Sequence, residues 1–326
     1  MKTDVTGRAV ALAMGLLLLG CSASPIDTGE TGQGATGRDP AGDEQPGQEP
    51  GSTSLARSPL PIVLLHGAAG FDQIGPLDYY FRVVDDLLDE GQQVFTTQVA
   101  PLQTIDVRAE QLAEQIDAIL DETGAGSVHL IAHSQGGLDA RFLISSLGYG
   151  DRVATLTTIS TPHQGSRVAD VALGILPGGA EDALGFLIDL LVGAVAGGEQ
   201  DVVGQLYQLT EEYAATFNAE NPDDPRVEYY SVAGVTQTNP FANPFKNDLC
   251  EPLLLAGFAL LHPLGPNDGL VSVESAQHGQ LLGTMPADHL DEVGQFFGTT
   301  ALGFDHRDFY VELAGFLTDP EAPPPL

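Results

Sequence analysis

A serine at the centre of a five-residue motif is the side chain best placed to do chemistry in this sequence. Ser134 has the small residues Ala132 and Gly136 two positions to either side, an apolar run before it and a helical pattern after it. This is typical of a nucleophile elbow, a sharp turn from strand to helix that projects a serine into a cleft. The N-terminus of the following helix also favours a developing negative charge. The motif predicts that Ser134 is a nucleophile in acyl transfer; the alternative is a helix-capping serine on an inert turn.

A glycine-containing loop early in the chain could supply the second part of this chemistry. The apolar run at 61–65 is followed by His66-Gly67-Ala68-Ala69-Gly70. Acyl transfer needs two N–H donors aimed at the oxyanion. In proteins with such an elbow, they come from the residue after the nucleophile and from an early loop. We therefore expect the backbone N–H groups of Gln135 and Ala68 to form an oxyanion hole; the alternative is an ordinary loop.

A carboxylate and a histidine late in the chain complete the set, in the required order of serine, acid and histidine. Asp268 lies in Asn267-Asp268-Gly269, on a turn before a strand-like run, and His289 lies in the acidic segment 287–293. We expect His289 to take the Ser134 proton and later protonate the leaving alcohol, and Asp268 to fix the imidazole tautomer and stabilise its cation. The alternative for Asp268 is a plain Asp-Gly turn. The remaining histidines flank the loop and the elbow or lie elsewhere: His66, His129, His133, His163, His262, His278 and His306.

Neighbouring carboxylates can limit the loss of activity that follows from removing Asp268. Asp288 and Asp291 adjoin His289 in the sequence. We expect one of these two to substitute in part for Asp268 when it is removed.

The elements that would position these residues alternate between strand and helix. Strands are expected at 61–65, 93–99, 128–132 and 153–160, and helices at 77–90, 107–120 and 138–147. A β-α-β-α order predicts an α/β protein with a mostly parallel sheet that is covered by helices on both faces.

Composition and charge limit the class of partner. The chain has 326 residues, and its 43% hydrophobic content rules out wholesale disorder. Its 45 acidic and 12 basic residues give a formal charge of −33, which disfavours nucleic acid and bare anionic lipid as partners. So acidic a surface suits a saline habitat, where ions screen self-repulsion; a plain acidic, soluble surface is the alternative.

The N-terminal part is typical of a sorting signal followed by a linker. An apolar run at 9–20 ends in Leu18-Leu19-Gly20-Cys21, which is too short to span a membrane and resembles a bacterial lipobox. We expect residues 1–20 to be a lipoprotein signal peptide and Cys21 to carry the lipid, with the outer membrane favoured by Ser22. The alternatives are an ordinary signal peptide and a secreted protein. Residues 21–58 are rich in Gly, Pro and acidic side chains and predict a disordered tether, so the folded domain is expected at 59–326.

A glycine-rich apolar segment is a candidate lid. The region 169–200 contains many glycines, and within it residues 183–195 carry one charge, Asp189. Glycines are unfavourable in a rigid core helix but usable in a lid that opens. A core helix is the alternative.

Taken together, the motifs resemble a known family. The chain is similar to the Pseudomonas and Burkholderia type of bacterial triacylglycerol lipases, the family I true lipases, in segments that follow in order: 61–67, 70–72, 107–112, 132–137, 158–165, 267–272 and 289–295. The resemblance implies an α/β-hydrolase fold with a mobile lid and activity on acylglycerol esters at an oil–water interface. The triad of that family falls on Ser134, Asp268 and His289.

The same resemblance implies a structural Ca²⁺ and no organic cofactor. By correspondence with the family, the ligands are the carboxylates of Asp291 and Asp248 and the backbone carbonyls of Gln295 and Thr299. A cation of this kind would tie the segment that carries His289 to another loop. The alternatives are a helix N-terminal acid for Asp291 and a solvated loop acid for Asp248.

Two departures from the family bear on its other properties. Ala132 stands where the family's elbow begins with Gly, and Cys250 is the only cysteine of the expected domain, with Glu274 near the position of the usual second cysteine. Cys250 is therefore expected to be a buried free thiol. The departures leave open the need for a dedicated foldase. A carboxylesterase for other esters and an inert ligand-binding surface lipoprotein are the alternative functions.

Overall fold

A computed structural model describes residues 60–70, 73–74, 77–176, 200–236, 251–295, 298, 300–301, 303–319 and 321–326. These residues belong to one compact unit, Arg57–Leu326. The predicted signal peptide and tether lie outside the described residues, as do most of the predicted lid and the residues Cys21, Asp248, Cys250 and Thr299.

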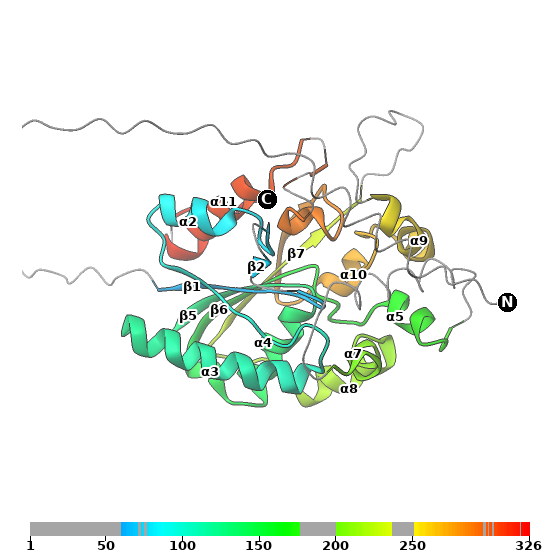
Figure 1. Cartoon of the computed structure of the whole chain (residues 1–326), viewed down its shortest axis with the longest axis horizontal. Helices are drawn as coiled ribbons and strands as arrows, with labels where there is room; N and C mark the ends of the chain where they lie inside the picture. The colour runs from blue at the N-terminus through cyan, green and yellow to red at the C-terminus, as the bar shows by residue number, and fades with distance from the viewer. Residues whose placement is uncertain are drawn as a thin grey trace, which may run out of the picture. The chain divides into compact units, whose positions relative to one another are not determined.

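A six-stranded sheet with the order β4-β1-β5-β6-β7-β8 forms the centre of the fold (Figure 1). Every neighbouring pair of its strands is parallel, so the predicted α/β class is confirmed. The strands are β1 (Ile62–Leu65), β4 (Val94–Thr96), β5 (Val128–His133), β6 (Val153–Ile159), β7 (Glu228–Gly234) and β8 (Gln280–Met285).

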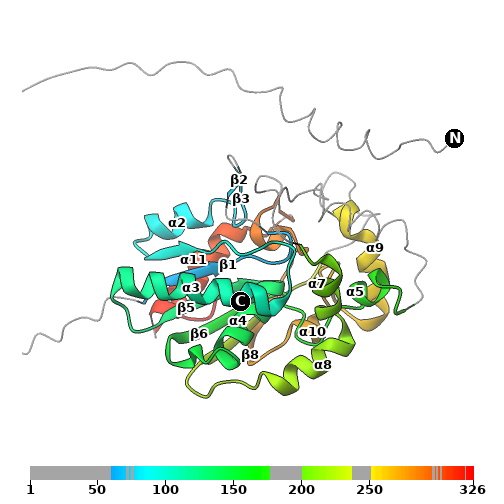
Figure 2. The same ribbon diagram turned by 60° about the horizontal axis from the view of Figure 1, so that its bottom comes forward.

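The helices cover both faces of this sheet. α2 (Val83–Asp89) and α11 (His306–Thr318) lie on one face, and α3 (Ile105–Thr123) and α4 (Gln135–Ser145) on the other (Figures 1 and 2). The remaining helices and short turns are α5 (Arg167–Ala172), η1 (Tyr149–Asp151), α7 (Val202–Gln208), α8 (Glu211–Glu220), α9 (Glu251–Leu261), η2 (His262–Leu264), α10 (Val273–Ala276) and η3 (Asp291–Val293).

The alternation of side chains along β1 explains the two-layer core. Ile62 and Leu64 pack in the cluster with α2 and α11, whereas Val63 and Leu65 pack in the cluster with α3 and α4. All four are at most 2% exposed, because successive strand residues point to opposite faces and both faces carry helices.

Two predicted elements differ from the structure. The helix expected at 77–90 begins only at Val83, because Arg82 adopts a left-handed backbone with a φ angle of 59°. The residues before it form β3 (Leu77–Asp78), which pairs antiparallel with β2 (Gln73–Ile74). The strand-like run after Asp268 leads into α10 instead, where the Ser272 hydroxyl caps the helix by accepting from the Ser275 N–H group.

The start of the predicted lid is part of the packed domain. Residues 169–172 form the end of α5, and Val168 and Val171 pack against Leu261 of α9. Among the described residues, the structure has no helix long and apolar enough to cross a membrane.

Candidate active site

Ser134 occupies the strained turn that its motif predicts. It lies between β5 and α4 with φ 55° and ψ −130°, a backbone conformation that is unfavourable for a residue with a side chain and is found where function requires it. A Cβ atom added at Gly136 would lie 2.8 Å from the carbonyl oxygen of His66. The neighbouring strand therefore crowds this turn and requires the glycine.

The three residues chosen from the sequence lie within hydrogen-bonding distance in the expected order. His289 Nε2 is 2.9 Å from Ser134 Oγ, and His289 Nδ1 is 2.7 Å from Asp268 Oδ2. The other carboxylate oxygen of Asp268 accepts hydrogen bonds from the N–H groups of Leu270 and Val271 at 2.8 and 2.7 Å. Asp268 is fully buried and His289 is 5% exposed, so the acid and the base are held rigidly while Ser134 stays half-buried.

The loop that carries Ala68 lies against the elbow. A Cβ added at the preceding Gly67 would lie 2.7 Å from the Cβ of Ser134. Arg108, a buried residue of α3, donates to the carbonyl oxygens of His66 and Gly67 at 2.9 and 3.2 Å. Arg108 thereby fixes the loop of one predicted oxyanion donor, and Gln135 is the first residue of α4.

The same arginine connects this loop to the helix that follows the nucleophile. Arg108 Nε donates to Asp139 Oδ2 of α4 at 2.7 Å, and both side chains are buried. A buried ion pair of this kind contributes geometry more than stability. It links the two segments that would supply the oxyanion donors.

The His66 side chain also serves this loop and is not a second base. Its Nε2 accepts from the Val99 N–H group at 3.2 Å, and its Nδ1 bonds to the Gly67 carbonyl oxygen at 2.9 Å. Burial and the nearby Arg108 charge lower the pKa of His66 to about 3. His66 is therefore neutral and holds the loop.

A carboxylate that the sequence analysis left out lies beside the acid. Glu292 is completely buried, and a Cβ added at Gly234 would lie 1.9 Å from Glu292 Oε1 and 3.0 Å from Asp268 Cβ. Burial and the charge of Asp268 raise the pKa of Glu292 well above its usual value. The only sequence signal was its position three residues after His289.

The two carboxylates that were expected to substitute in part for Asp268 both accept hydrogen bonds from the backbone. Asp288 Oδ1 accepts from the N–H groups of Leu290 and Asp291, both at 2.9 Å. Asp291 Oδ2 accepts from the Ala301 N–H group at 3.0 Å. That one of them substitutes in part for Asp268 stays a prediction, and Glu292, which adjoins Asp268, is a further candidate for this role.

Of the four predicted calcium ligands, two lie in the described part. Asp291 is fully buried on η3, two residues after His289. Gln295 uses its side-chain amide to donate to the Tyr79 carbonyl oxygen at 2.5 Å. The Asp291 carboxylate is thus joined to the backbone at Ala301, ten residues further along the chain.

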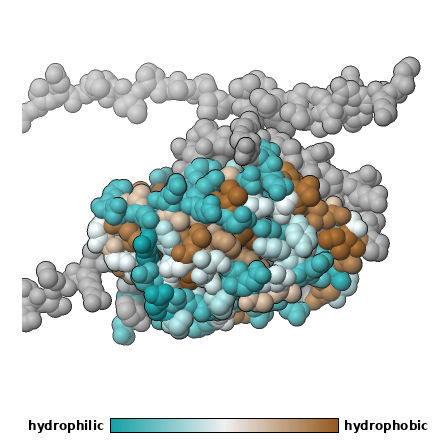
Figure 3. Space-filling view, turned by 90° about the horizontal axis from the view of Figure 1, so that it is seen from below, coloured by the Kyte–Doolittle hydropathy of each residue, from teal (hydrophilic) through white to brown (hydrophobic). Residues whose placement is uncertain are grey.

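The helices α5, α7 and α9 lie around the triad and its neighbours, and exposed apolar side chains lie on them or next to them. Gly257 of α9 is so close to the Asp268 turn that an added Cβ would lie 2.0 Å from the Gly269 carbonyl oxygen. Gln205 of α7 donates to Gln135 Oε1 at 2.7 Å. Apolar surface gathers on the side of the molecule where α5 and α9 lie (Figures 1 and 3). The exposed large apolar residues on or next to these helices are Ile175, Val203, Tyr207, Leu255 and Leu264.

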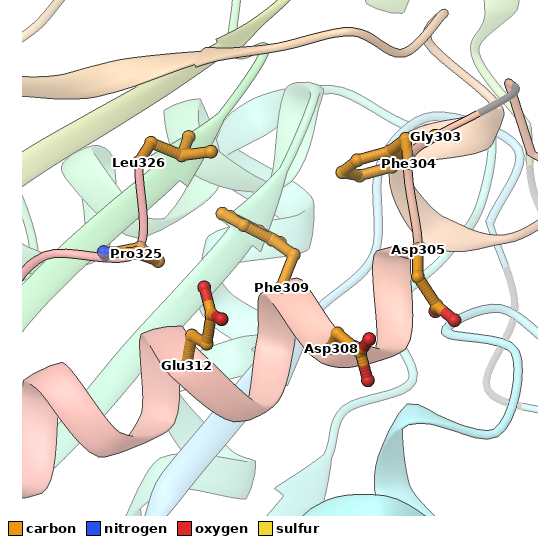
Figure 4. A pocket seen from close by; sticks show the side chains of 8 residues that line it. All are labelled: Gly303, Phe304, Asp305, Asp308, Phe309, Glu312, Pro325 and Leu326. Atoms are coloured by element: carbon orange, nitrogen blue, oxygen red, sulfur yellow. The ribbon is translucent and has the colours of Figure 1, made fainter.

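A separate pocket lies on α11. It is lined by Phe304, Phe309, three acidic side chains and the end of the chain at Pro325 and Leu326 (Figure 4). No triad residue lines it, so it is not part of this site.

Comparisons with known proteins show the family to which this fold belongs. The profile of the alpha/beta hydrolase fold family matches residues 61–223. A triacylglycerol lipase of Vibrio cholerae is 34% identical over 265 residues, which cover 74% of this chain and 82% of the relative. A triacylglycerol lipase of Burkholderia plantarii is 29% identical and is covered over 92% of its length, with 91% of this chain.

Solved structures support the fold. The mature Bacillus licheniformis lipase BlEst2 superposes with a TM-score of 0.61 at 21% identity, covering 80% of this chain and 93% of that one. At this identity the likeness concerns the fold alone.

Proposed function

The chain belongs to the triacylglycerol lipases of the alpha/beta hydrolase family, and from this premise we propose which of its residues carry the hydrolysis of acylglycerol esters. Ser134 is the nucleophile, His289 the general base and acid, and Asp268 the residue that orients His289. The observation that carries the proposal is the unbroken hydrogen bonding from Ser134 Oγ through His289 to Asp268.

The reaction follows from these positions. Ser134 Oγ attacks the ester carbonyl carbon while its proton passes to His289 Nε2. The N–H groups of Ala68 and Gln135 stabilise the oxyanion of the tetrahedral intermediate. His289 then protonates the leaving alcohol, which leaves an acyl group on Ser134. Water, deprotonated by His289, attacks this ester and releases the fatty acid.

Activity on a graded series of glycerides tests this proposal and separates it from the esterase alternative. We expect hydrolysis of emulsified long-chain triglycerides, and loss of it in Ser134→Ala with the fold retained. Full activity on short soluble esters without any on emulsified glycerides would favour a carboxylesterase. Absence of all ester hydrolysis would favour the ligand-binding lipoprotein.

The enzyme binds its substrate at an oil–water interface, and the side of the protein that contacts this interface is formed by α5, α7 and α9. The support is the exposed apolar side chains on this side, among them Val203 at 69% exposure, since exposed apolar patches mark binding surfaces. The predicted lid at 169–200 belongs to the same proposal. Its test is the rate on emulsified triglyceride compared with the rate on soluble esters.

A structural Ca²⁺ stabilises the His289 loop. The support is the fully buried Asp291 carboxylate, two residues after His289, since carboxylate and carbonyl oxygens are the ligands that Ca²⁺ prefers. Asp291, Gln295, Asp248 and Thr299 would hold the ion, which supplies rigidity and no chemical step.

Chelation tests the ion directly. A chelator should lower the melting temperature and the rate, with added Ca²⁺ restoring both. Asp291→Ala should mimic the chelator and remove the response to it, whereas Asp305→Ala, an exposed helix cap of α11, should respond as the native protein does. Metal-free protein that melts and turns over as before would refute the ion.

Lipid on Cys21 anchors the enzyme in the bacterial cell envelope, at the outer membrane. The support is the lipobox-like sequence before Cys21, and two or more acyl chains suffice for stable anchoring. Cys21→Ser should release the protein or leave its signal uncut, while Cys250→Ser, the matched control, should stay membrane-bound. Failure of the native protein to incorporate labelled palmitate would count against the anchor.

A further inference from the structure

A second serine at the end of a strand combines a strained backbone with a buried hydroxyl. Ser160 directly follows β6 with a φ angle of 45° and is 1% exposed. A side chain in this left-handed region is unfavourable and persists only where the surrounding structure holds it. The reaction assigned to Ser134 does not use Ser160, so the strain calls for another explanation.

The hydroxyl of Ser160 connects two segments next to the triad. It accepts from the Gly234 N–H group at 3.0 Å and donates to Glu292 Oε1 at 2.6 Å. Because its oxygen accepts from Gly234, its single hydrogen is directed to Glu292. The unusual backbone thus serves to hold one oxygen of the buried carboxylate beside Asp268.

The other oxygen of Glu292 ends a second series of hydrogen bonds. The Gly67 N–H group donates to Tyr79 Oη at 3.1 Å, and Tyr79 Oη lies 2.7 Å from His133 Nδ1. His133 Nε2 lies 3.0 Å from Glu292 Oε2. If each group donates to the next, the tautomer of His133 carries its hydrogen on Nε2. All the donors then converge on Glu292.

This series of hydrogen bonds passes through His133, the residue before Ser134, and connects the predicted oxyanion loop to the carboxylate beside Asp268. At one end, Gly67 precedes the predicted oxyanion donor Ala68. At the other end, Glu292 adjoins Asp268, and the ring of His133 lies 4.6 Å from the ring of His289, centre to centre. One ring nitrogen of His133, one ring nitrogen of His289 and one carboxylate oxygen of Glu292 all lie within 4.8 Å of one another.

We propose that Ser160 is a positioning residue, which uses Glu292, His133 and Tyr79 to hold the acid–base pair at a fixed distance from the oxyanion loop. This inference rests on the proposed function of Ser134, His289 and Asp268. Catalytic groups must be held to within about 0.5 Å of the productive geometry, and the support is built from residues that do not touch the substrate.

Two substitutions at Ser160 separate the hydroxyl from the backbone strain. Ser160→Ala removes the hydroxyl and keeps the strain, whereas Ser160→Gly removes both, since glycine adopts this conformation freely. We expect kcat on a soluble ester to fall about tenfold in both variants, the size of one lost buried hydrogen bond, with an unchanged KM. Ser160→Gly should melt at a higher temperature than Ser160→Ala.

Ser275→Ala is the matched control. The Ser275 hydroxyl is also buried, accepts from the Gln164 N–H group at 3.1 Å and donates to the Gly165 carbonyl oxygen at 2.6 Å, but it has no link to Glu292. Its loss should lower the melting temperature and leave kcat unchanged.

A double-mutant cycle and one parallel variant complete the test. Ser160→Gly should add nothing to the kcat loss of Glu292→Leu, because leucine has no acceptor and either substitution removes the contact between Ser160 and Glu292. Native kcat in Ser160→Gly, multiplying losses in the cycle, or an equal kcat loss in Ser275→Ala would overturn the positioning role. Ser134→Ala, assayed in the same experiment, separates the two proposals. Native rates in Ser134→Ala would overturn the proposed function itself. An inactive Ser134→Ala together with a fully active Ser160→Gly would overturn only the role of Ser160.

Discussion

Two neighbouring strands of the sheet end in a serine with similar backbone strain, yet the two hydroxyls have different surroundings. Ser134 follows β5 with a φ of 55° and Ser160 follows β6 with a φ of 45°. Each N–H group donates to the next strand of the sheet, from Ser134 to Ile159 and from Ser160 to Val232, both at 2.9 Å. The two turns are therefore equivalent positions of adjacent strands.

The segment after each serine makes the difference. α4 begins directly after Ser134, so this hydroxyl lies at a helix N-terminus and reaches His289. Thr161 follows Ser160, and its hydroxyl donates to the Ser134 carbonyl oxygen at 2.7 Å, which closes the second turn against the first. The comparison teaches that one strained turn can present a nucleophile or a buried support, depending on the chain that follows.

The largest effect should come from removing the partner of the first serine. His289→Ala leaves Ser134 without a base, and we expect kcat to fall at least ~10³-fold, compared with about tenfold for loss of the Ser160 hydroxyl. Steady-state kinetics on p-nitrophenyl butyrate, with circular dichroism to check folding, measure this. A folded His289→Ala variant with near-native rates would remove the distinction between the two serines.

A smaller loss is expected for Asp268→Asn. Asp268→Asn removes one of the charges that raise the Glu292 pKa, so Glu292 can ionise and stabilise the His289 cation in part. The loss should be roughly 10²-fold, below the ~10⁴-fold that a missing orienting aspartate can cost. Adding Glu292→Gln should deepen it. Equal kcat values for the single and double variants would mean that Glu292 gives no such support.

Crowding at the first turn predicts a stability effect. Gly136→Ala would bring a Cβ to within 2.8 Å of the His66 carbonyl oxygen, and we expect it to cost about 2 kcal/mol of unfolding free energy. Gly126→Ala is the control, because nothing lies within 4 Å of a Cβ added there. Urea unfolding compares the two, and equal midpoints would show that the elbow tolerates a larger residue.

The smallest change in rate is expected from a substitution on the exposed apolar surface, away from the turns at Ser134 and Ser160. Val203→Ser removes an exposed apolar side chain of α7, and we expect the rate on emulsified triglyceride to fall about threefold, as for one side chain lost from an apolar contact, with no change on soluble ester. Leu88→Ser, on α2 and also exposed, should change neither rate. Equal losses for both variants on the emulsion would argue against a specific lipid-facing side.

The sequence predicted the parts of this site that depend on local pattern. The β-α-β-α order of the segments predicted the parallel sheet. The small residues around Ser134 and the order of the late acid and histidine selected three residues that the structure brings together. Tyr79 and Glu292 could not be found in this way, because they approach His133 from segments 54 and 159 residues away. The φ angles of Arg82 and Ser160 were equally inaccessible, since neither residue type favours a left-handed backbone.

Covalent labelling tests the central claim most directly, because it asks which of the two serines is the nucleophile. The native protein would be incubated with a p-nitrophenyl alkylphosphonate, which phosphonylates an activated serine with release of p-nitrophenol, and then digested and mapped by mass spectrometry. We predict one label per chain, on Ser134, with complete loss of lipase activity and none on Ser160. A label on any other residue, or full inactivation without modification of Ser134, would contradict the account.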